Sequence, residues 1–183
     1  MITAASFARE QKIPYLGLCY GMQLACVAFA RDVLNLRDAN TEENSKTGKH
    51  KVIHFIPTQK KLVEKKSYGG TMRLGGWEAK IQPNSRAYEI YHRYNGFKDE
   101  KKLLTSERHR HRYEFNDEFA NDFEKAGLII SARSTVENLA EIIELPKSVH
   151  PFYFGTQGHP EYKSRPLSPH PVFLEFINAC VRK

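Results

Sequence analysis

The segment "YLGLCYGMQLA", residues 15–25, has a cysteine at the point where a strand-like apolar run ends. Cys19 lies between Gly17 and Gly21, and good helix formers follow it. Glycines on both sides allow a sharp strand-to-helix turn that lifts the intervening side chain above the sheet edge. At a helix N-terminus, unpaired N–H groups and the helix dipole favour a negative charge, and therefore a thiolate. The pattern predicts that Cys19 is a nucleophile.

The other two cysteines, Cys26 and Cys180, have no such pair of glycines around them. Free cysteines often fill small apolar spaces in a core, and we expect that role for both. The Gly-x-Cys-x-Gly pattern is itself only moderately specific. A nucleophilic role for Cys19 therefore requires a base elsewhere in the sequence.

A second polar segment, "GTQGHPEYKSRP" at residues 155–166, supplies a candidate base. If the chain stays extended beyond Gln157, His159 and Glu161 project to the same side, because side chains of extended backbone alternate. Pro160 between them stiffens that spacing. Cys19, His159 and Glu161 then have the residue types of a nucleophile, a base and an orienting acid for acyl transfer. Taken by itself, His-Pro-Glu could equally be a polar loop.

The segment "ERHRHRYE", residues 107–114, is open to two other interpretations. His109 and His111 could belong to a metal site, but no cysteine or acidic cluster lies nearby in the sequence to complete four ligands. The arginines could bind nucleic acid, but only Tyr113 and Phe115 are available there for base stacking. We therefore predict no metal site and no nucleic-acid partner.

Alternating hydrophobic patterns predict the elements that position these residues. Residues 2–11 and 21–35 have helical spacing, and residues 13–18 between them have the pattern of a strand. This strand-to-helix unit is typical of an α/β fold. Residues 38–66 are polar, and we expect part of them to form a mobile loop. In the rest of the chain we expect strands at residues 50–57 (stopped by Pro57), 75–82, 127–134, 139–145 and 151–157, and an amphipathic helix at 171–181.

Length, cysteine count and charge limit the class of protein. The 183 residues are about the size of one domain, and no apolar run of roughly 18 residues predicts a membrane span. Three cysteines do not form a disulfide framework, and the first residues lack the pattern of a secretion signal. The net charge of +7 favours anionic partners, although basic and acidic residues are interspersed. We expect a cytoplasmic domain without a membrane partner.

The motifs "YLGLCYGMQ" and "QGHPE" resemble those of class I glutamine amidotransferase domains. The further motifs "DANTEE", "GGTMRLG" and "ERHRHRYE", with "HPEYKSRP" and the "SPH" that follows it, resemble the glutaminase domain of the CTP synthase family. The resemblance extends over nearly the whole chain. It implies an α/β fold, a flavodoxin-like sheet with flanking helices, and a catalytic triad of Cys19, His159 and Glu161.

The resemblance also implies contacts with glutamine. The zwitterionic end of that substrate requires an anion for its ammonium group and a fixed cation for its carboxylate. Glu43 and Arg112 have those charges, although without the resemblance Glu43 reads as a solvated loop acid. The implied substrate contacts are Tyr20, Gly21, Met22, Gln23, Glu43 and Arg112.

The reaction that the resemblance implies is hydrolysis of glutamine. The cysteine attacks the side-chain amide, ammonia leaves as a thioester forms, and water then releases glutamate. In the family, the ammonia aminates ATP-activated UTP to CTP in a synthetase domain of a homotetrameric enzyme. That domain is expected upstream and binds ATP and Mg, while GTP is an allosteric activator. No cofactor is implied for the glutaminase domain itself.

The sequence departs from the family pattern in three respects. Gly158 stands where a bulky Phe or Tyr is usual, and Tyr20 where a leucine is usual, so both could alter substrate packing. The family's first strand and glycine-rich loop, which provides a second oxyanion donor, are absent upstream of Met1. We therefore expect residues 1–183 to be an N-terminally truncated domain with little or no activity alone. An inactive or regulatory module, or another class I glutamine amidotransferase, is the alternative.

Overall fold

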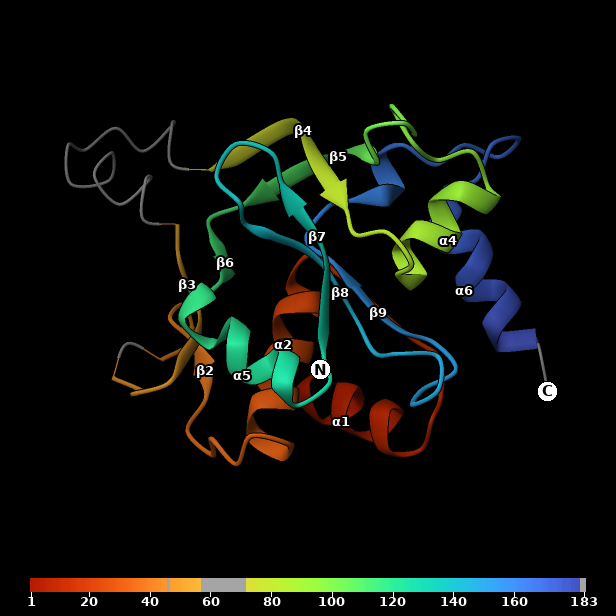
Figure 1. Cartoon of the computed structure of the whole chain (residues 1–183). Helices are drawn as coiled ribbons and strands as arrows, with labels where there is room; N and C mark the ends of the chain where they lie inside the picture. The colour runs from red at the N-terminus through yellow and green to blue at the C-terminus, as the bar shows by residue number, and fades with distance from the viewer. Residues whose placement is uncertain (46, 57–71, 182–183) are drawn as a thin grey trace.

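The strands of the computed structural model, which describes residues 1–45, 47–56 and 72–181, form two sheets (Figure 1). The larger has six strands in the order β1-β9-β8-β7-β4-β5. β1 and β9 pair in parallel, and the other neighbours pair antiparallel. Its strands are β1 (Tyr15–Leu18), β4 (Arg73–Ile81), β5 (Leu104–His111), β7 (Ile129–Ser134), β8 (Ala140–Glu144) and β9 (Tyr153–Thr156).

The smaller sheet has three strands, β2 (Asn40–Thr41), β3 (Lys51–Phe55) and β6 (Tyr113–Phe115). It packs against helix α2 (Tyr20–Asp32). β6 begins directly after β5 ends, so Arg112 lies where the chain passes from the larger sheet to the smaller one. Since β6 contacts α2, the end of the "RHRHRY" segment lies beside that helix.

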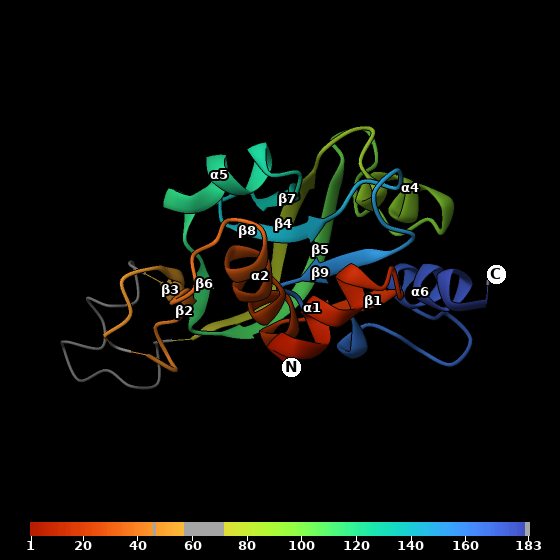
Figure 2. The ribbon, with the colours of Figure 1, turned by 90° about the horizontal axis from the view of Figure 1, so that it is seen from below.

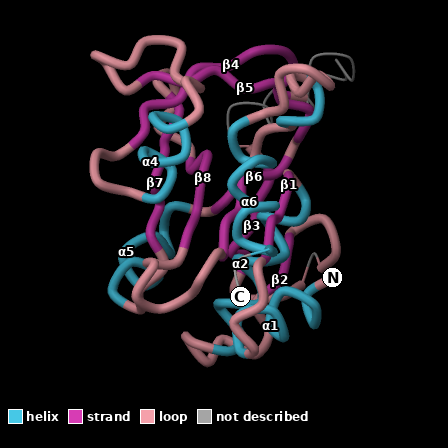
Figure 3. Tube along the Cα trace, turned by 90° about the vertical axis from the view of Figure 1, so that its right-hand side faces the viewer, coloured by secondary structure: helices cyan, strands magenta, loops and turns pink. Residues whose placement is uncertain are grey.

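Helices cover both faces of the larger sheet (Figure 2). α1 (Ile2–Glu10) packs against α2, and α4 (Arg86–Arg93) packs against α6 (Pro171–Val181). At the start of β9 the side chain of Tyr153 packs in the α2 core, while Phe154, and Phe152 just before the strand, pack in the core beside α4 and α6. Figure 3 shows β4 and β5 at one end of the molecule and α1 at the other. The remaining helical elements are η2 (Asp117–Phe119), α5 (Ala120–Lys125) and η3 (Pro160–Tyr162).

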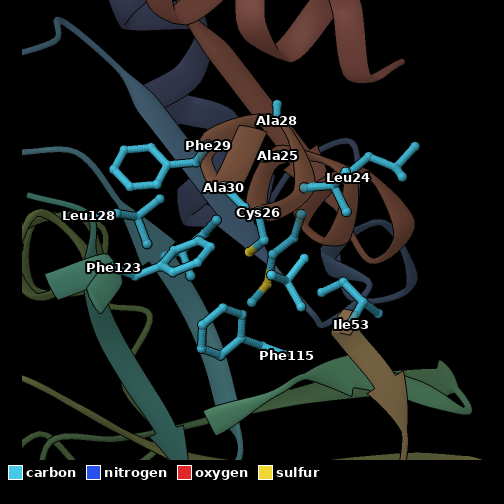
Figure 4. Packing of buried hydrophobic residues seen from close by; sticks show 14 of the residues in the cluster. Leu24, Ala25, Cys26, Ala28, Phe29, Ala30, Ile53, Phe115, Phe123 and Leu128 are labelled. Atoms are coloured by element: carbon cyan, nitrogen blue, oxygen red, sulfur yellow. The ribbon is translucent and has the colours of Figure 1, made fainter. Parts of the chain in front are cut away.

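The larger core surrounds α2 (Figure 4). Residues 21–30 of this helix are all buried, so the helix is enclosed rather than amphipathic. Phe123 of α5 packs between Phe29 and Phe115, with ring centroids 5.3 Å and 5.0 Å away. This enclosure fixes the first turn of α2, which follows Cys19.

The predicted α/β class with flanking helices is confirmed, and the predicted helices and strands are found with shifted ends. α2 ends at Asp32 rather than at residue 35, and the chain then turns at Asn35 with a left-handed φ of 58°. Cys26 is buried as expected, but the prediction for Cys180 is wrong because α6 exposes that side of the helix. The sequence patterns missed β2, α4, β5, β6 and α5. Pro57 and the expected loop residues 58–66 lie outside the described residues.

None of the helices in the described residues is both long enough and apolar enough to span a membrane.

Candidate active site

Cys19 lies on a sharp turn between β1 and α2. Its backbone has φ 48° and ψ −102°, a conformation that L residues rarely adopt. Gly17 is required by close packing, because a Cβ there would lie 2.7 Å from the carbonyl carbon of Gly21. A Cβ at Gly21 would meet only the Tyr15 hydroxyl, at 3.8 Å. The predicted strand-to-helix turn is therefore present, and the strained residue is the cysteine itself.

The parallel pairing of β1 and β9 brings the two predicted motifs together. Leu18 pairs with Thr156, and the Cys19 N–H donates to the Thr156 carbonyl over 2.7 Å. Because parallel strands end at the same edge of a sheet, the residues after β9 lie beside Cys19. The next side chain along, Gln157, donates from Nε2 to the Cys19 sulfur at 3.4 Å.

His159 is held from both sides, and one of its ring nitrogens has no hydrogen-bond partner among the described residues. Its backbone N–H donates to the Arg108 carbonyl, and its Nδ1 lies 2.6 Å from Glu161 Oε1. The ring also stacks on Tyr162 with centroids 5.2 Å apart. Nε2 is buried and makes no hydrogen bond within the described chain. A carboxylate on Nδ1 leaves Nε2 as the nitrogen that can accept a proton.

The contact between His159 and Glu161 is made in a different backbone conformation from the expected one. The segment Pro160–Tyr162 forms a single 3₁₀ turn that begins with Pro160, so the prediction of an extended chain is wrong. Proline fits the start of a helical turn because its fixed φ is helical and its missing N–H is not needed there. The turn brings Glu161 back toward the imidazole of the residue two positions earlier.

Burial decides the ionisation of the cysteine. It raises the pKa of the Cys19 thiol to about 11, and the nearby Glu161 and Glu43 carboxylates add to that effect. The hydrogen bonds from the Tyr20 backbone N–H and from Gln157 lower the pKa, but less than burial raises it. The expectation that the helix N-terminus favours a thiolate is therefore wrong for the free site, because desolvation of the sulfur outweighs it. Cys19 needs a base for activation.

A pocket of about 510 Å³ opens in front of Cys19. Glu43 and Arg112 line it and are both exposed, so a carboxylate and a guanidinium are available to a ligand that contacts the sulfur. The Tyr20 hydroxyl accepts a hydrogen bond from Asn44 Nδ2 at 2.8 Å, which links α2 to the loop that carries Glu43. The lining residues are Cys19, Tyr20, Gln23, Glu43, Asn44, Met72, Arg110, His111, Arg112 and Tyr113.

Two of the predicted substrate contacts, Met22 and Gly21, make other contacts in the structure. The Met22 side chain is fully buried in the α2 core, and its atoms would lie about 3 Å from a Cβ at Gly155 of β9. The Gly21 carbonyl accepts a hydrogen bond from the Tyr15 hydroxyl at 2.8 Å. Both residues stay predictions as substrate contacts.

A buried polar cluster behind the pocket was missed by sequence reasoning. Arg73 forms a buried ion pair with Glu141, and His109 Nε2 lies 3.5 Å from the same carboxylate. His109 Nδ1 contacts His111 Nε2 at 3.1 Å. Burial lowers the pKa of His109 to about 2 and that of His111 to about 3, so both are neutral. No group of three potential metal ligands is found in the described ranges.

Close packing against β5 explains why residue 158 is a glycine. A Cβ at this position would lie 2.7 Å from the Cβ of Glu107, a buried residue of β5. Glu107 cannot move easily, because its Oε1 accepts hydrogen bonds from the Tyr91 hydroxyl and from His170 Nε2, each at 2.9 Å. The path of the chain between Gln157 and His159 therefore leaves no room for a side chain.

Comparison with known proteins identifies the family. The family model for "Glutamine amidotransferase class-I" matches residues 1–179. The chain is 50% identical over 180 residues to the CTP synthase of Caldanaerobacter subterraneus and 49% identical over 179 residues to that of Sulfolobus acidocaldarius. Each match covers 98% of this chain but 31% of the relative, so the chain spans less than a third of their length.

A solved structure agrees with this result. The glutaminase domain of Trypanosoma brucei CTPS with bound acivicin is 34% identical, with a TM-score of 0.85. The match covers 100% of this chain and 65% of that one. The family match over nearly the whole sequence and this likeness in fold lead to one conclusion. The chain belongs to the class I glutamine amidotransferase family.

Proposed function

We propose that this chain is the glutaminase domain of a CTP synthase and that it hydrolyses glutamine with Cys19, His159 and Glu161. The observation that carries the proposal is the pocket in which Cys19 shares the walls with Glu43 and Arg112. The comparisons support the choice of substrate, because a similar glutaminase domain binds acivicin, a glutamine analogue. Its pocket and this one are expected to recognise the same amino-acid end.

Recognition follows from the charges on the pocket walls. The ammonium group of glutamine pairs with the Glu43 carboxylate, and its carboxylate pairs with the Arg112 guanidinium, which can form two parallel hydrogen bonds. Tyr20 and Gln23 line the same pocket as these groups and the sulfur. The side-chain amide of the substrate then reaches toward Cys19.

Catalysis begins with a neutral thiol. His159 Nε2 removes the thiol proton as Cys19 attacks the amide carbon. The Tyr20 backbone N–H hydrogen-bonds to the sulfur in the free site. Because this N–H is at the start of α2, we expect it to donate to the oxyanion as the oxyanion develops. The imidazolium, stabilised by Glu161, gives the proton to the leaving ammonia. Water activated by the same histidine hydrolyses the thioester to glutamate.

The larger enzyme supplies the rest of the reaction. Since the matched CTP synthases are about three times as long as this chain, we propose that a synthetase domain binds ATP, Mg and UTP and uses the ammonia to form CTP. GTP activation, a homotetramer and a cytoplasmic location belong to the same proposal.

The test separates the two activities in the full-length enzyme. Cys19→Ala should lower glutamate release from glutamine by at least about a thousandfold and abolish glutamine-dependent CTP formation, while CTP formation from free ammonia continues. Cys180→Ala is the matched control, because that cysteine is exposed on α6, and it should leave both activities unchanged. Loss of both activities in Cys19→Ala, or of neither, contradicts the proposal.

A further inference from the structure

Gln157 is a buried amide that the reaction described above does not use. The residue is 1% exposed, and its Nε2 donates to the Cys19 sulfur at 3.4 Å. Its backbone N–H donates to the Glu141 carbonyl of β8 at 2.8 Å. The residue is therefore fixed in the sheet at the same time as it contacts the nucleophile.

The orientation of this amide is set by Gln23. The Gln23 Nε2 donates to Gln157 Oε1 at 3.1 Å and to the Tyr113 carbonyl at 2.8 Å. An amide whose oxygen accepts this hydrogen bond must present its NH₂ group on the other side, toward the sulfur. Gln23 is 3% exposed, so the pair is shielded from water, where an amide flip would leave buried groups unsatisfied.

We propose that Gln157 is a positioning residue that holds the Cys19 sulfur and stabilises its thiolate, with Gln23 fixing the direction of the donor. The inference rests on the proposed function, since it assigns a further residue to the same site. Glu161 and Glu43 disfavour the thiolate, and two of the donors that oppose them are the Tyr20 N–H and the Gln157 amide. A hydrogen bond to a charged acceptor is stronger than one to a neutral acceptor, so this contact strengthens as the thiol ionises.

The experiment measures alkylation of Cys19 by iodoacetamide between pH 7 and pH 10, with peptide mapping by mass spectrometry. Gln157→Leu keeps the size of the side chain but removes the donor, so we expect about tenfold slower alkylation at pH 8, the effect of about one unit of pKa. Gln157→Glu can still accept from Gln23 but adds a negative charge, and we expect a larger decrease. Gln82→Leu, at the exposed residue that follows β4, is the matched control and should leave the rate unchanged.

The other cysteines report on folding within the same sample. Cys26 is fully buried and should stay unmodified in every folded variant, whereas exposed Cys180 should react at one constant rate. The ionisable groups that line the pocket with Cys19 or act on its charge are the same in the Leu variant and the unaltered chain: Tyr20, Glu43, Arg110, His111, Arg112, Tyr113 and Glu161. The same holds for His159, which contacts Glu161. A change in the Cys19 profile with Cys26 protected therefore reports on Gln157 alone.

An unaltered Cys19 profile in folded Gln157→Leu and Gln157→Glu overturns the proposal. If both variants expose Cys26, the decision comes from the unsubstituted, ¹⁵N-labelled chain. There the Gln157 side-chain amide resonances should shift with the same pH dependence as Cys19 alkylation, and resonances that stay constant overturn the proposal. Alkylation does not require turnover. A full-length enzyme that releases no glutamate but shows the altered profile contradicts the proposed function and supports the positioning role.

Discussion

His159 and Glu161 are joined by a 2.6 Å contact between Nδ1 and Oε1, across the first turn of a 3₁₀ helix. The carboxylate side chain is 44% exposed, whereas the imidazole is 17% exposed. The acid therefore orients the ring from the solvent side, and Nε2 lies on the buried side. Because the two residues have different roles, substituting them should lower the activity to different extents.

We predict that Glu161→Gln retains more glutaminase activity than His159→Ala, by roughly tenfold to a hundredfold in kcat. The histidine moves the proton, whereas the carboxylate only orients and stabilises the ring. Steady-state glutamate release in the full-length enzyme checks the ratio, with melting temperature as the control for folding. Equal losses in two folded variants would assign the orienting role to another group.

The close approach of β1 to the first turn of α2 predicts that alanine at Gly17 and alanine at Gly21 have different effects on stability. Gly17→Ala should lower the free energy of unfolding by about 1–3 kcal/mol, because its Cβ would lie 2.7 Å from backbone that cannot shift easily. Gly21→Ala should change it by much less, because the nearest atom to its Cβ is 3.8 Å away. Urea denaturation of both variants measures the difference. Similar losses at the two positions would refute this account of the turn.

Sequence reasoning found the elements whose hydrophobic pattern is regular and missed those whose buried side chains are polar. β5 buries Thr105, Glu107, His109 and His111 on one face, so it alternates but offers no apolar signal. The site residues Cys19 and His159 were found because each belongs to a motif with a stated chemical use. The polar residues behind them, Gln157 among them, depend on partners far away in the sequence, and spacing alone cannot identify those partners.

The lack of space at Gly158 predicts an effect on catalysis. Gly158→Ala should lower kcat for glutamine by about a hundredfold, since the Cβ contact with Glu107 must displace the loop that carries His159, and a shift of about 1 Å at a catalytic group has that effect. Gly76→Ala on β4, where a Cβ meets only a serine oxygen at 3.7 Å, is the control. Unchanged kcat in a folded Gly158→Ala enzyme would show that the loop adapts without moving the histidine.

The neutral pair His109 and His111 predicts how stability depends on pH. Burial lowers their pKa values from about 6.5 to about 2 and about 3, so only the unfolded chain takes up protons as the pH falls below 6.5. Their contribution to stability is fully present above pH 6.5 and is lost as the pH falls toward the folded-state values, by about 1.4 kcal/mol per pH unit for each histidine. Urea denaturation at pH 7.5, 6 and 5 measures this slope.

The double variant His109→Gln/His111→Gln should be less stable at pH 7.5, because it loses buried contacts, but its stability should fall less steeply as the pH is lowered. His92→Gln, at an exposed position on α4, should keep the original slope. A double variant with the slope of the unaltered chain would mean that other groups cause the acid sensitivity.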